Sequence, residues 1–246
     1  MNAPMLSVDR LCAWYSAAQV LFDVSLSVGR GEVVALMGRN GAGKSTTMRA
    51  LMGLVDRRAA ALTFRGRDIS RLPSHRIARL GLGWVPEDRR IFTDLTVMEN
   101  LDIGRQPARR WDGDGEDGSP APSWTPERLF RLFPNLGEMR ERAGGNMSGG
   151  EQQMLTVART LMGNPLLLLL DEPSEGVAPL IVEQMASTIA ELKKQGLSVL
   201  LSEQNLHFAG LVADRAYLLE QGRIAWQGGM QELAADEGLQ RNFLTL

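Results

Sequence analysis

The apolar positions of this chain fall into short runs that stop at glycine or at charged residues. Four runs are too short for helices and predict buried strands: Glu32–Met37, Leu82–Val85, Leu166–Leu170 and Ser198–Ser202. Alternating or short apolar segments predict further strands at the two ends of the chain: Leu6–Val8, Val20–Val28, Arg215–Leu219 and Arg223–Trp226.

Helical patterns lie between these predicted strands. The spacing predicts helices over Lys44–Leu54, Thr96–Gln106, Gly150–Met162 and Pro179–Lys194. Thr125 followed by Pro126 has the residues of a helix start, with threonine as the cap and proline at the first position. Because strands alternate with helices, the sequence predicts an α/β fold with a mostly parallel central sheet.

Composition excludes several classes of protein. Of 246 residues, 44% are hydrophobic and 23% charged, which is typical of a folded globular chain, and the net charge of -2 does not favour nucleic acid. Cys12 is the single cysteine, so no internal disulfide forms, which fits a reducing compartment. The N-terminus lacks the pattern of a secretory signal, and no apolar run approaches the roughly 20 residues of a membrane span.

The segment Asp112–Ser123 is rich in Gly, Pro and acidic residues, and we interpret it as a solvated loop without a functional role. We therefore expect a chain that neither crosses a membrane nor enters a secretory route by itself. If it serves a membrane process, it must dock onto another protein.

The segment Gly38–Ser45 fits the phosphate-loop pattern G-x-x-x-x-G-K-[ST], between a predicted strand and a predicted helix. Its glycines let backbone N–H groups surround phosphates at a helix N-terminus. Lys44 is expected to reach the β- and γ-phosphates, and Ser45 to ligate Mg²⁺. The sequence thus predicts ATP binding by Gly38, Asn40, Gly41, Gly43, Lys44, Ser45 and Thr46.

Two adjacent carboxylates, Asp171 and Glu172, follow the predicted strand Leu166–Leu170 directly. Ligands of open α/β sheets bind at this carboxyl edge. Asp171 is expected to hold Mg²⁺, and Glu172 to orient or deprotonate the attacking water.

Between these motifs stands Ser148-Gly149-Gly150-Glu151-Gln152-Gln153, a second glycine-rich helix start suited to an anion. With it, nearly the whole chain resembles the ABC ATPase family, whose signature reads LSGGQ; here Met147 replaces Leu and Glu151 replaces Gln. The resemblance implies a P-loop NTPase core over residues 1–86 and 150–246, with an N-terminal antiparallel β region. It also implies a small helical insertion over about 87–149, all within one ABC ATPase domain.

The resemblance assigns further residues. Tyr15 matches the aromatic residue that stacks on adenine, and the loop Ser174-Glu175-Gly176 matches the one that touches the opposite subunit. Two positions depart from the common pattern, because Glu87 replaces a glutamine and Gln204 replaces the switch histidine. Gln204 can bond a γ-phosphate but cannot carry a titrating proton.

Glu87 would take part in nucleotide and Mg²⁺ binding, and Lys44, Glu172 and Gln204 in catalysis. We interpret His207 as outside the switch position and His75 as a helix-surface residue.

These departures, with the motifs around them, resemble the LivF-like branch that energises branched-chain amino acid importers. That branch also includes subunits for urea, amides and other small polar solutes, so the solute stays open. The resemblance implies ATP hydrolysis between two ATPase subunits, each covering the partner's ATP with Ser148, Gly149, Gly150 and Glu151. The pair is a heterodimer or a homodimer.

We expect the chain to lie peripherally at the cytoplasmic face of the inner (plasma) membrane. Two membrane permease subunits, and indirectly a periplasmic solute-binding protein, complete the expected assembly. Other readings are an exporter ATPase, a non-transport ABC ATPase and a module that binds ATP without hydrolysing it. The absence of sustained heptads in Ser45–Met147 and the single ATPase domain disfavour the non-transport class.

Overall fold

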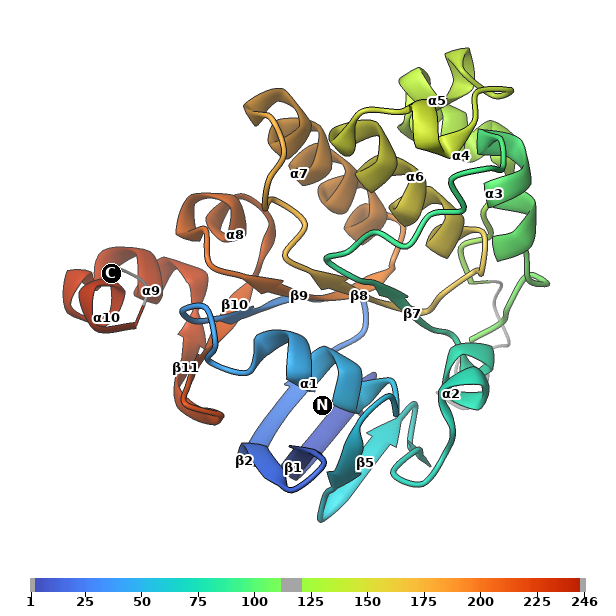
Figure 1. Cartoon of the computed structure of the whole chain (residues 1–246). Coiled ribbons are helices and arrows are strands. Elements are labelled where there is room, and N and C mark those ends of the chain that lie inside the picture. Colours follow the sequence, from blue (N-terminus) through green and yellow to red (C-terminus); the bar gives the residue numbers. More distant parts are fainter. Residues whose placement is uncertain (1–2, 112–120, 244–246) are drawn as a thin grey trace.

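The computed structural model describes residues 3–111 and 121–243. Most of the predicted acidic loop, Asp112–Ser123, lies outside these residues. The described chain forms two sheets and a set of helices (Figure 1). No helix among the described residues has the length and apolar character needed to cross a membrane.

A six-stranded sheet forms the centre of the molecule, in the order β11-β10-β3-β9-β8-β7. Neighbouring strands from β10 to β7 run parallel, and only β11 is antiparallel to its neighbour. The strands are β3 Val33–Met37, β7 Leu82–Val85, β8 Leu167–Asp171, β9 Ser198–Glu203, β10 Arg215–Glu220 and β11 Arg223–Gly229. The predicted α/β fold with a mostly parallel sheet is confirmed.

The N-terminal strands form a separate antiparallel sheet in the order β2-β1-β5-β6, with β4 also paired to β1. Its members are β1 Leu6–Tyr15, β2 Ala18–Val28, β4 Asp56–Arg58, β5 Ala61–Phe64 and β6 Arg67–Asp68. Prediction placed only Leu6–Val8 and Val20–Val28 here. Polar strands such as β4 form because β1 offers backbone partners, and residue pattern alone does not record this.

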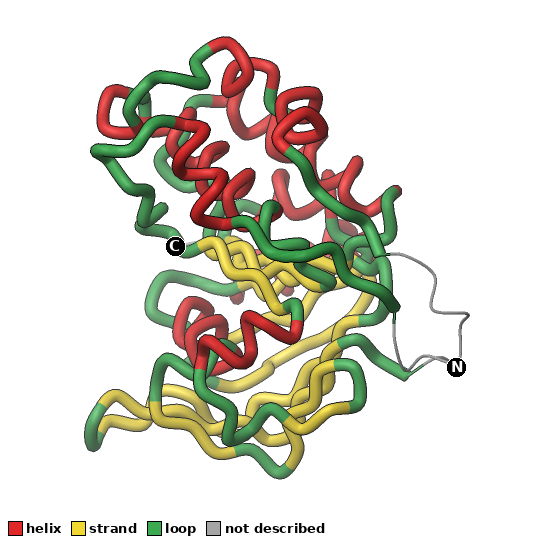
Figure 2. Tube along the Cα trace, turned by 90° about the vertical axis from the view of Figure 1, so that its right-hand side faces the viewer, coloured by secondary structure: helices red, strands yellow, loops and turns green. Residues whose placement is uncertain are grey.

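Helices cover both faces of the parallel sheet. Figure 1 shows α6, α7 and α8 on one face and α1 on the other. Figure 2 shows α1 between the two sheets, in agreement with its contacts to strands of both. These four helices are α1 Lys44–Leu51, α6 Gly149–Leu161, α7 Pro179–Lys194 and α8 Leu206–Val212.

The shorter helices lie around this framework. They are α2 Ser74–Leu80, α3 Val97–Gly104, α4 Pro126–Leu132, α5 Pro134–Glu138, α9 Met230–Ala235 and α10 Glu237–Phe243, with a 3₁₀ turn at Gly144–Asn146. The side chain of Thr125 caps α4 and Thr96 forms a capping box with Glu99 at the start of α3. The starts of α3 and α4 are therefore determined by capping residues close in sequence, as predicted.

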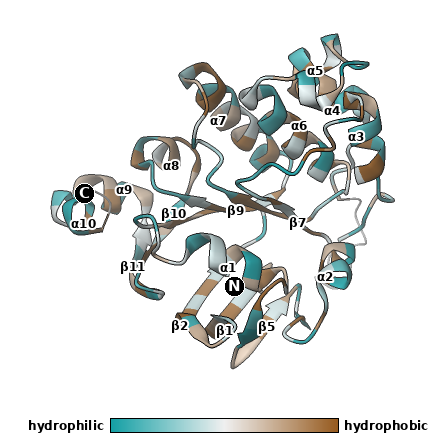
Figure 3. Ribbon diagram, in the orientation of Figure 1, coloured by the Kyte–Doolittle hydropathy of each residue, from teal (hydrophilic) through white to brown (hydrophobic). Residues whose placement is uncertain are grey.

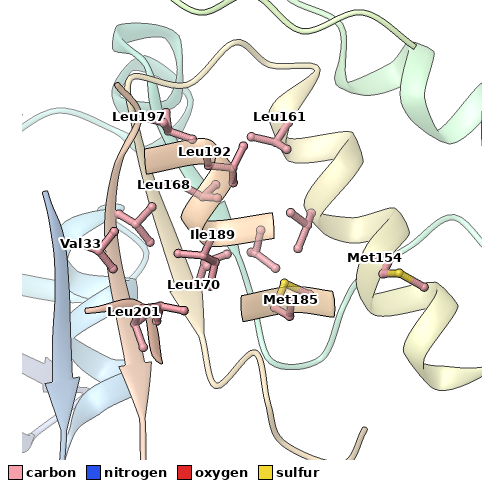
Figure 4. Close-up of a cluster of buried hydrophobic side chains, with 14 of the residues drawn as sticks. Val33, Met154, Leu161, Leu168, Leu170, Met185, Ile189, Leu192, Leu197 and Leu201 are labelled. Carbon is pink, nitrogen blue, oxygen red and sulfur yellow. The ribbon is translucent and has the colours of Figure 1, made fainter. Parts of the chain in front are cut away.

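Alternate residues of the buried strands serve two different cores. Leu168 and Leu170 of β8 pack toward α6 and α7, beside Met185 and Ile189 (Figure 4). Leu167 of β8 faces the antiparallel sheet and α1 instead. Because both faces are covered, these strands need continuous apolar runs. Figure 3 shows the apolar colouring concentrated on the central strands.

Candidate nucleotide-binding site

The predicted site residues gather at one edge of the parallel sheet. Strands β3, β9, β8 and β7 are parallel, so their carboxyl ends meet at this edge. Gly38 follows β3, Gln204 follows β9, Asp171 ends β8 and Glu87 follows β7. Residues that are far apart in the chain are therefore neighbours in space.

The phosphate loop closes around the side chain of Lys44. Its ammonium group donates hydrogen bonds to the carbonyl oxygens of Gly38 at 2.8 Å and Arg39 at 3.2 Å. Gly43 has φ +110°, and a β-carbon there would lie 2.9 Å from Leu21 Cδ2. This position therefore favours glycine on both conformational and steric grounds.

The other predicted nucleotide-binding residues of this loop differ in exposure. Asn40 and Gly41 are exposed at the tip, whereas Ser45 is half-buried and Thr46 buried on the first turn of α1. The tip of the phosphate loop is therefore exposed to solvent, whereas the side chain of Lys44 is buried.

Lys44 also forms an ion pair with Glu172. The ammonium nitrogen lies 3.1 Å from Glu172 Oε1, and the two side chains are only 3% and 9% exposed. Burial opposes the charge of Glu172, but hydrogen bonding with Glu175 and the charge of Lys44 together lower its pKa. The hydrogen bond to Glu172, together with burial, raises the pKa of Glu175 to about 7.

Asp171 is buried, and its two carboxylate oxygens differ in their hydrogen bonding. Its Oδ1 accepts a hydrogen bond from the Ser202 hydroxyl at 2.6 Å, whereas Oδ2 has no hydrogen-bond partner among the described residues. Burial raises the pKa of Asp171, while hydrogen bonding with Ser202 and Ser45 lowers it. A buried carboxylate oxygen without a donor, beside a serine hydroxyl, suits a hard cation such as Mg²⁺.

Gln204 lies at the end of β9, next to the buried carboxylate of Glu203. Glu203 Oε2 accepts hydrogen bonds from the backbone N–H groups of Gln204 and Asn205, and its Oε1 accepts one from Ser174. Asn205 in turn caps α8 through Phe208 N–H. Gln204, the predicted switch residue, therefore lies in a turn whose backbone N–H groups are hydrogen-bonded to the side chains of Glu203 and Asn205.

The serine–glycine motif begins α6 on the opposite face of the sheet from α1 (Figure 1). Ser148 and Glu151 form a capping box, in which Glu151 Oε2 accepts the Ser148 N–H at 2.7 Å. A β-carbon on Gly150 would lie 2.7 Å from Ile181 Cγ1 of α7. Within the described part of the chain, no hydrogen bond joins this turn to the phosphate loop.

Four peripheral residues were also interpreted from sequence. Tyr15 ends β1, is 40% exposed, and accepts a hydrogen bond from Arg49 at 3.0 Å. Glu87 is exposed, and its charge acts on Glu175. His75 on α2 and His207 on α8 are exposed helix residues, whereas Gln204 directly follows β9.

The comparisons with known proteins agree with this geometry. The family model described as "ABC transporter" matches residues 21–175. BraG of Pseudomonas aeruginosa, a high-affinity branched-chain amino acid transport ATP-binding protein, is 44% identical over 89% of this chain and 91% of its own length. LptB of Escherichia coli K12, a lipopolysaccharide export system ATP-binding protein, is 36% identical over 97% of this chain and 96% of its own length.

A solved ATP-binding subunit of an ABC transporter superposes with a TM-score of 0.76 at 29% identity, covering 96% of this chain and 94% of that one. The chain belongs to the ABC transporter ATPase family. It is an ATP-binding ATPase of that family, which confirms the predicted P-loop fold and enzyme class.

Sequence reasoning assigned no role to two residues of the site, Ser202 and Glu203. Ser202 bonds Asp171 through its hydroxyl and accepts the Glu172 N–H at 3.1 Å, and Glu203 joins two loops. Their place at the end of a buried strand was a signal. However, Asp171 and Ser174, which they contact, lie at the end of β8 and in the loop after it, and these contacts depend on strand register.

Proposed function

We propose that this chain hydrolyses MgATP in a pair of ATPase subunits and energises the import of branched-chain amino acids or a related small polar solute. The observation that carries the catalytic part is the buried pair of Lys44 and Glu172, 3.1 Å apart at the sheet edge. The solute follows from similarity to BraG, whose name states branched-chain amino acid transport.

Each site residue then has a chemical task. Phosphate oxygens entering the loop compete with Glu172 for the Lys44 ammonium group, which frees the Glu172 carboxylate to accept a proton from the attacking water. Before the nucleotide binds, the hydrogen bond with Glu175 and the charge of Lys44 lower the pKa of Glu172 and keep its carboxylate ionised. Gln204 donates a hydrogen bond to the γ-phosphate, and Tyr15 stacks on the adenine ring.

The hydroxyl of Ser45 and the unpartnered Oδ2 of Asp171 would hold Mg²⁺, with Glu87 near the outer side of the site. When bound, the ion neutralises charge on the phosphates. The part of the chain that the structure describes has no cluster of three His, Cys, Asp or Glu residues able to bind a metal by itself. The remaining ligands therefore come from the nucleotide and water.

A second ATPase subunit completes the site. The residues Ser148, Gly149, Gly150 and Glu151 begin α6 on the other face of the sheet from α1, and no hydrogen bond among the described residues joins them to the chain's own phosphate loop. A head-to-tail partner, identical or similar, presents the same glycine-rich helix N-terminus to the γ-phosphate. Hydrolysis removes that phosphate and weakens the closed pair.

A groove of about 450 Å³ between the sheet and the helical region, residues 87–149, receives a membrane permease in this proposal. Phe92 and Ile103 are 46% and 52% exposed at its wall. The buried atoms Trp84 Nε1 and Arg159 Nη1 have no hydrogen-bond partner among the described residues. Apolar walls with unused donors suit a permease segment that offers apolar side chains and a carbonyl or carboxylate acceptor.

This docking places the chain peripherally at the cytoplasmic face of the inner membrane, with a periplasmic solute-binding protein acting only through the permeases. Phe92→Ala with Ile103→Ala should reduce co-purification with the permeases encoded beside this gene. Leu211→Ala, an exposed leucine on α8, is the matched control. Equal recovery of both variants would reject the groove as the docking site.

The catalytic proposal is tested by phosphate release from the purified chain with MgATP. Lys44→Ala and Glu172→Gln should each lower turnover at least about 100-fold, the scale of a lost catalytic group. Lys194→Ala, an exposed lysine at the end of α7, should leave it unchanged. Turnover that survives both site variants would reject the assignment.

Solute and direction are tested by reconstitution. Similarity to LptB over nearly the whole chain keeps lipid export as a second candidate. Uptake of radiolabelled leucine into vesicles with permeases and binding protein supports amino-acid import, and uptake of urea or an amide instead identifies another solute of the same branch. Extraction of lipopolysaccharide, with no uptake, overturns import.

A further inference from the structure

Glu203 is a buried carboxylate with an unusual set of partners. It ends β9, is 2% exposed, and pairs in register with Met37 of β3. Among the described residues it forms no ion pair with lysine or arginine. Its charge is met by N–H donors instead, which is an effective way to hold a carboxylate out of water.

The two oxygens of Glu203 face different loops. Oε1 accepts the backbone N–H of Ser174 at 3.1 Å, and Oε2 accepts those of Gln204 and Asn205, both at 3.1 Å. Burial raises the pKa of Glu203, and the bonds from Ser174, Asn205 and Gln204 lower it. One side chain therefore spans the gap between the loop after β8 and the loop after β9.

These two loops have different tasks in the proposed function. The loop after β9 carries Gln204, which contacts the γ-phosphate in that proposal. The loop after β8 carries Ser174–Gly176, which the resemblance to the family implies at the partner subunit. At the same sheet edge, the Ser202 hydroxyl donates a hydrogen bond to the Asp171 carboxylate. Ser202 thus joins the ends of β8 and β9, whereas Glu203 joins the loops that follow these two strands.

We propose that Glu203 is a positioning residue that makes these two loops move as one unit, so that the state of the γ-phosphate at Gln204 reaches the partner subunit through Ser174. The role requires two acceptor oxygens on one side chain. Glutamine has the same shape but a single acceptor, so it can bond one loop or the other and not both. Glu203→Gln therefore breaks the coupling without opening a cavity.

The test is amide hydrogen exchange of the Ser174 and Gln204–Asn205 segments, with and without MgATP, beside ATP affinity and turnover. In the wild-type chain, MgATP should protect both segments. Glu203→Gln should bind ATP within about threefold of wild type and keep nucleotide protection in the Gln204–Asn205 segment. It should lose that protection at Ser174, and turnover should fall at least about tenfold, the scale of a lost charge-assisted hydrogen bond.

Glu183→Gln is the matched control, because Glu183 is exposed on α7. Glu203→Asp, which keeps both oxygens on a shorter side chain, should recover part of the turnover. Protection of both segments and wild-type turnover in Glu203→Gln would overturn the coupling. Equal loss of ATP affinity and of protection throughout the chain would also overturn it, since it would mark Glu203 as a purely structural residue.

The inference rests on the proposed ATPase cycle, and the same samples separate the two failures. A wild-type chain that does not bind or hydrolyse ATP refutes the cycle. Even then, exchange without nucleotide decides whether Glu203 joins the two loops, because Ser174 in Glu203→Gln should exchange at least about tenfold faster than in wild type. Unchanged amide exchange in this variant would show that Glu203 does not join the two loops.

Discussion

Ser202→Ala removes one hydroxyl that bonds the Asp171 carboxylate and the backbone N–H of Glu172. The hydroxyl donates to Asp171 Oδ1 at 2.6 Å and accepts the Glu172 N–H at 3.1 Å, in a residue that is fully buried. The Glu172 N–H keeps a second acceptor, the Ser202 carbonyl at 3.1 Å. The main loss is therefore the bond to the buried Asp171 carboxylate.

A hydrogen bond to a charged group contributes about 1.5–3 kcal/mol, so we expect the free energy of unfolding to fall by about 2 kcal/mol. For a chain of this size, each kcal/mol lowers the Tm by about 2–4 °C, which gives a decrease of about 4–8 °C. Urea denaturation and a thermal scan measure the two quantities. Turnover should fall as well, because Asp171 and Glu172 lose a shared support.

The effect should depend on pH. Burial raises the pKa of Asp171 above its ordinary 3.8, and the Ser202 bond lowers it, so the pKa is higher still in Ser202→Ala. Above both folded-state pKa values, the ionised carboxylate misses its donor and the variant shows its full loss of stability. As the pH falls through those values, both chains take up the proton and the difference in stability shrinks.

Ser187→Ala on the exposed side of α7 is the control, and it should change stability by less than about 0.5 kcal/mol. If Ser202→Ala unfolds within that same margin of wild type near neutral pH, the reasoning is refuted. A loss that grows toward low pH would refute the assignment of the effect to Asp171.

Three further predictions follow from particular contacts. Gly150→Ala places a β-carbon 2.7 Å from Ile181 Cγ1, so thermal unfolding should show a loss of about 1–3 kcal/mol, whereas Gly210→Ala on α8, with nothing within 4 Å, should gain roughly 0.5–1 kcal/mol. A stable Gly150→Ala chain would contradict the packing. The pKa of Glu175 is raised to about 7 from an ordinary 4.5, so the folded state holds an extra proton between these values and stability should fall as the pH rises through them. Glu175→Gln should flatten that part of the Tm–pH curve, and an unchanged slope would assign it to other groups. Thr96→Ala removes the cap of α3 and should cost about 1 kcal/mol in urea denaturation, with no change in ATP affinity.

Local sequence was enough for the features that depend on near neighbours in the chain. The phosphate loop, the buried runs of β3 and β8, and the caps at Thr96 and Thr125 all follow from residues a few positions apart. Each relies on backbone geometry, helix capping or continuous burial, which a short segment encodes. The family-specific roles of Glu172, Gln204 and the serine–glycine turn were likewise predicted from motifs.

Other features needed the folded chain. The strand β4, Asp56–Arg58, has a polar sequence and exists through its pairing with β1, which residue pattern does not reveal. The helices α8–α10 were also missed, since short helices are stabilised mostly by tertiary packing.

The same holds within the site. The sequence determined that an aspartate, a glutamate and a lysine with the chemistry of ATP hydrolysis are present. The pairing of Lys44 with Glu172 at 3.1 Å, and the ties formed by Ser202 and Glu203, were decided by the parallel register of β3, β9 and β8. These contacts join residues that are far apart in the chain, and strand register depends on how whole strands pack, so only the tertiary structure decided which charges meet.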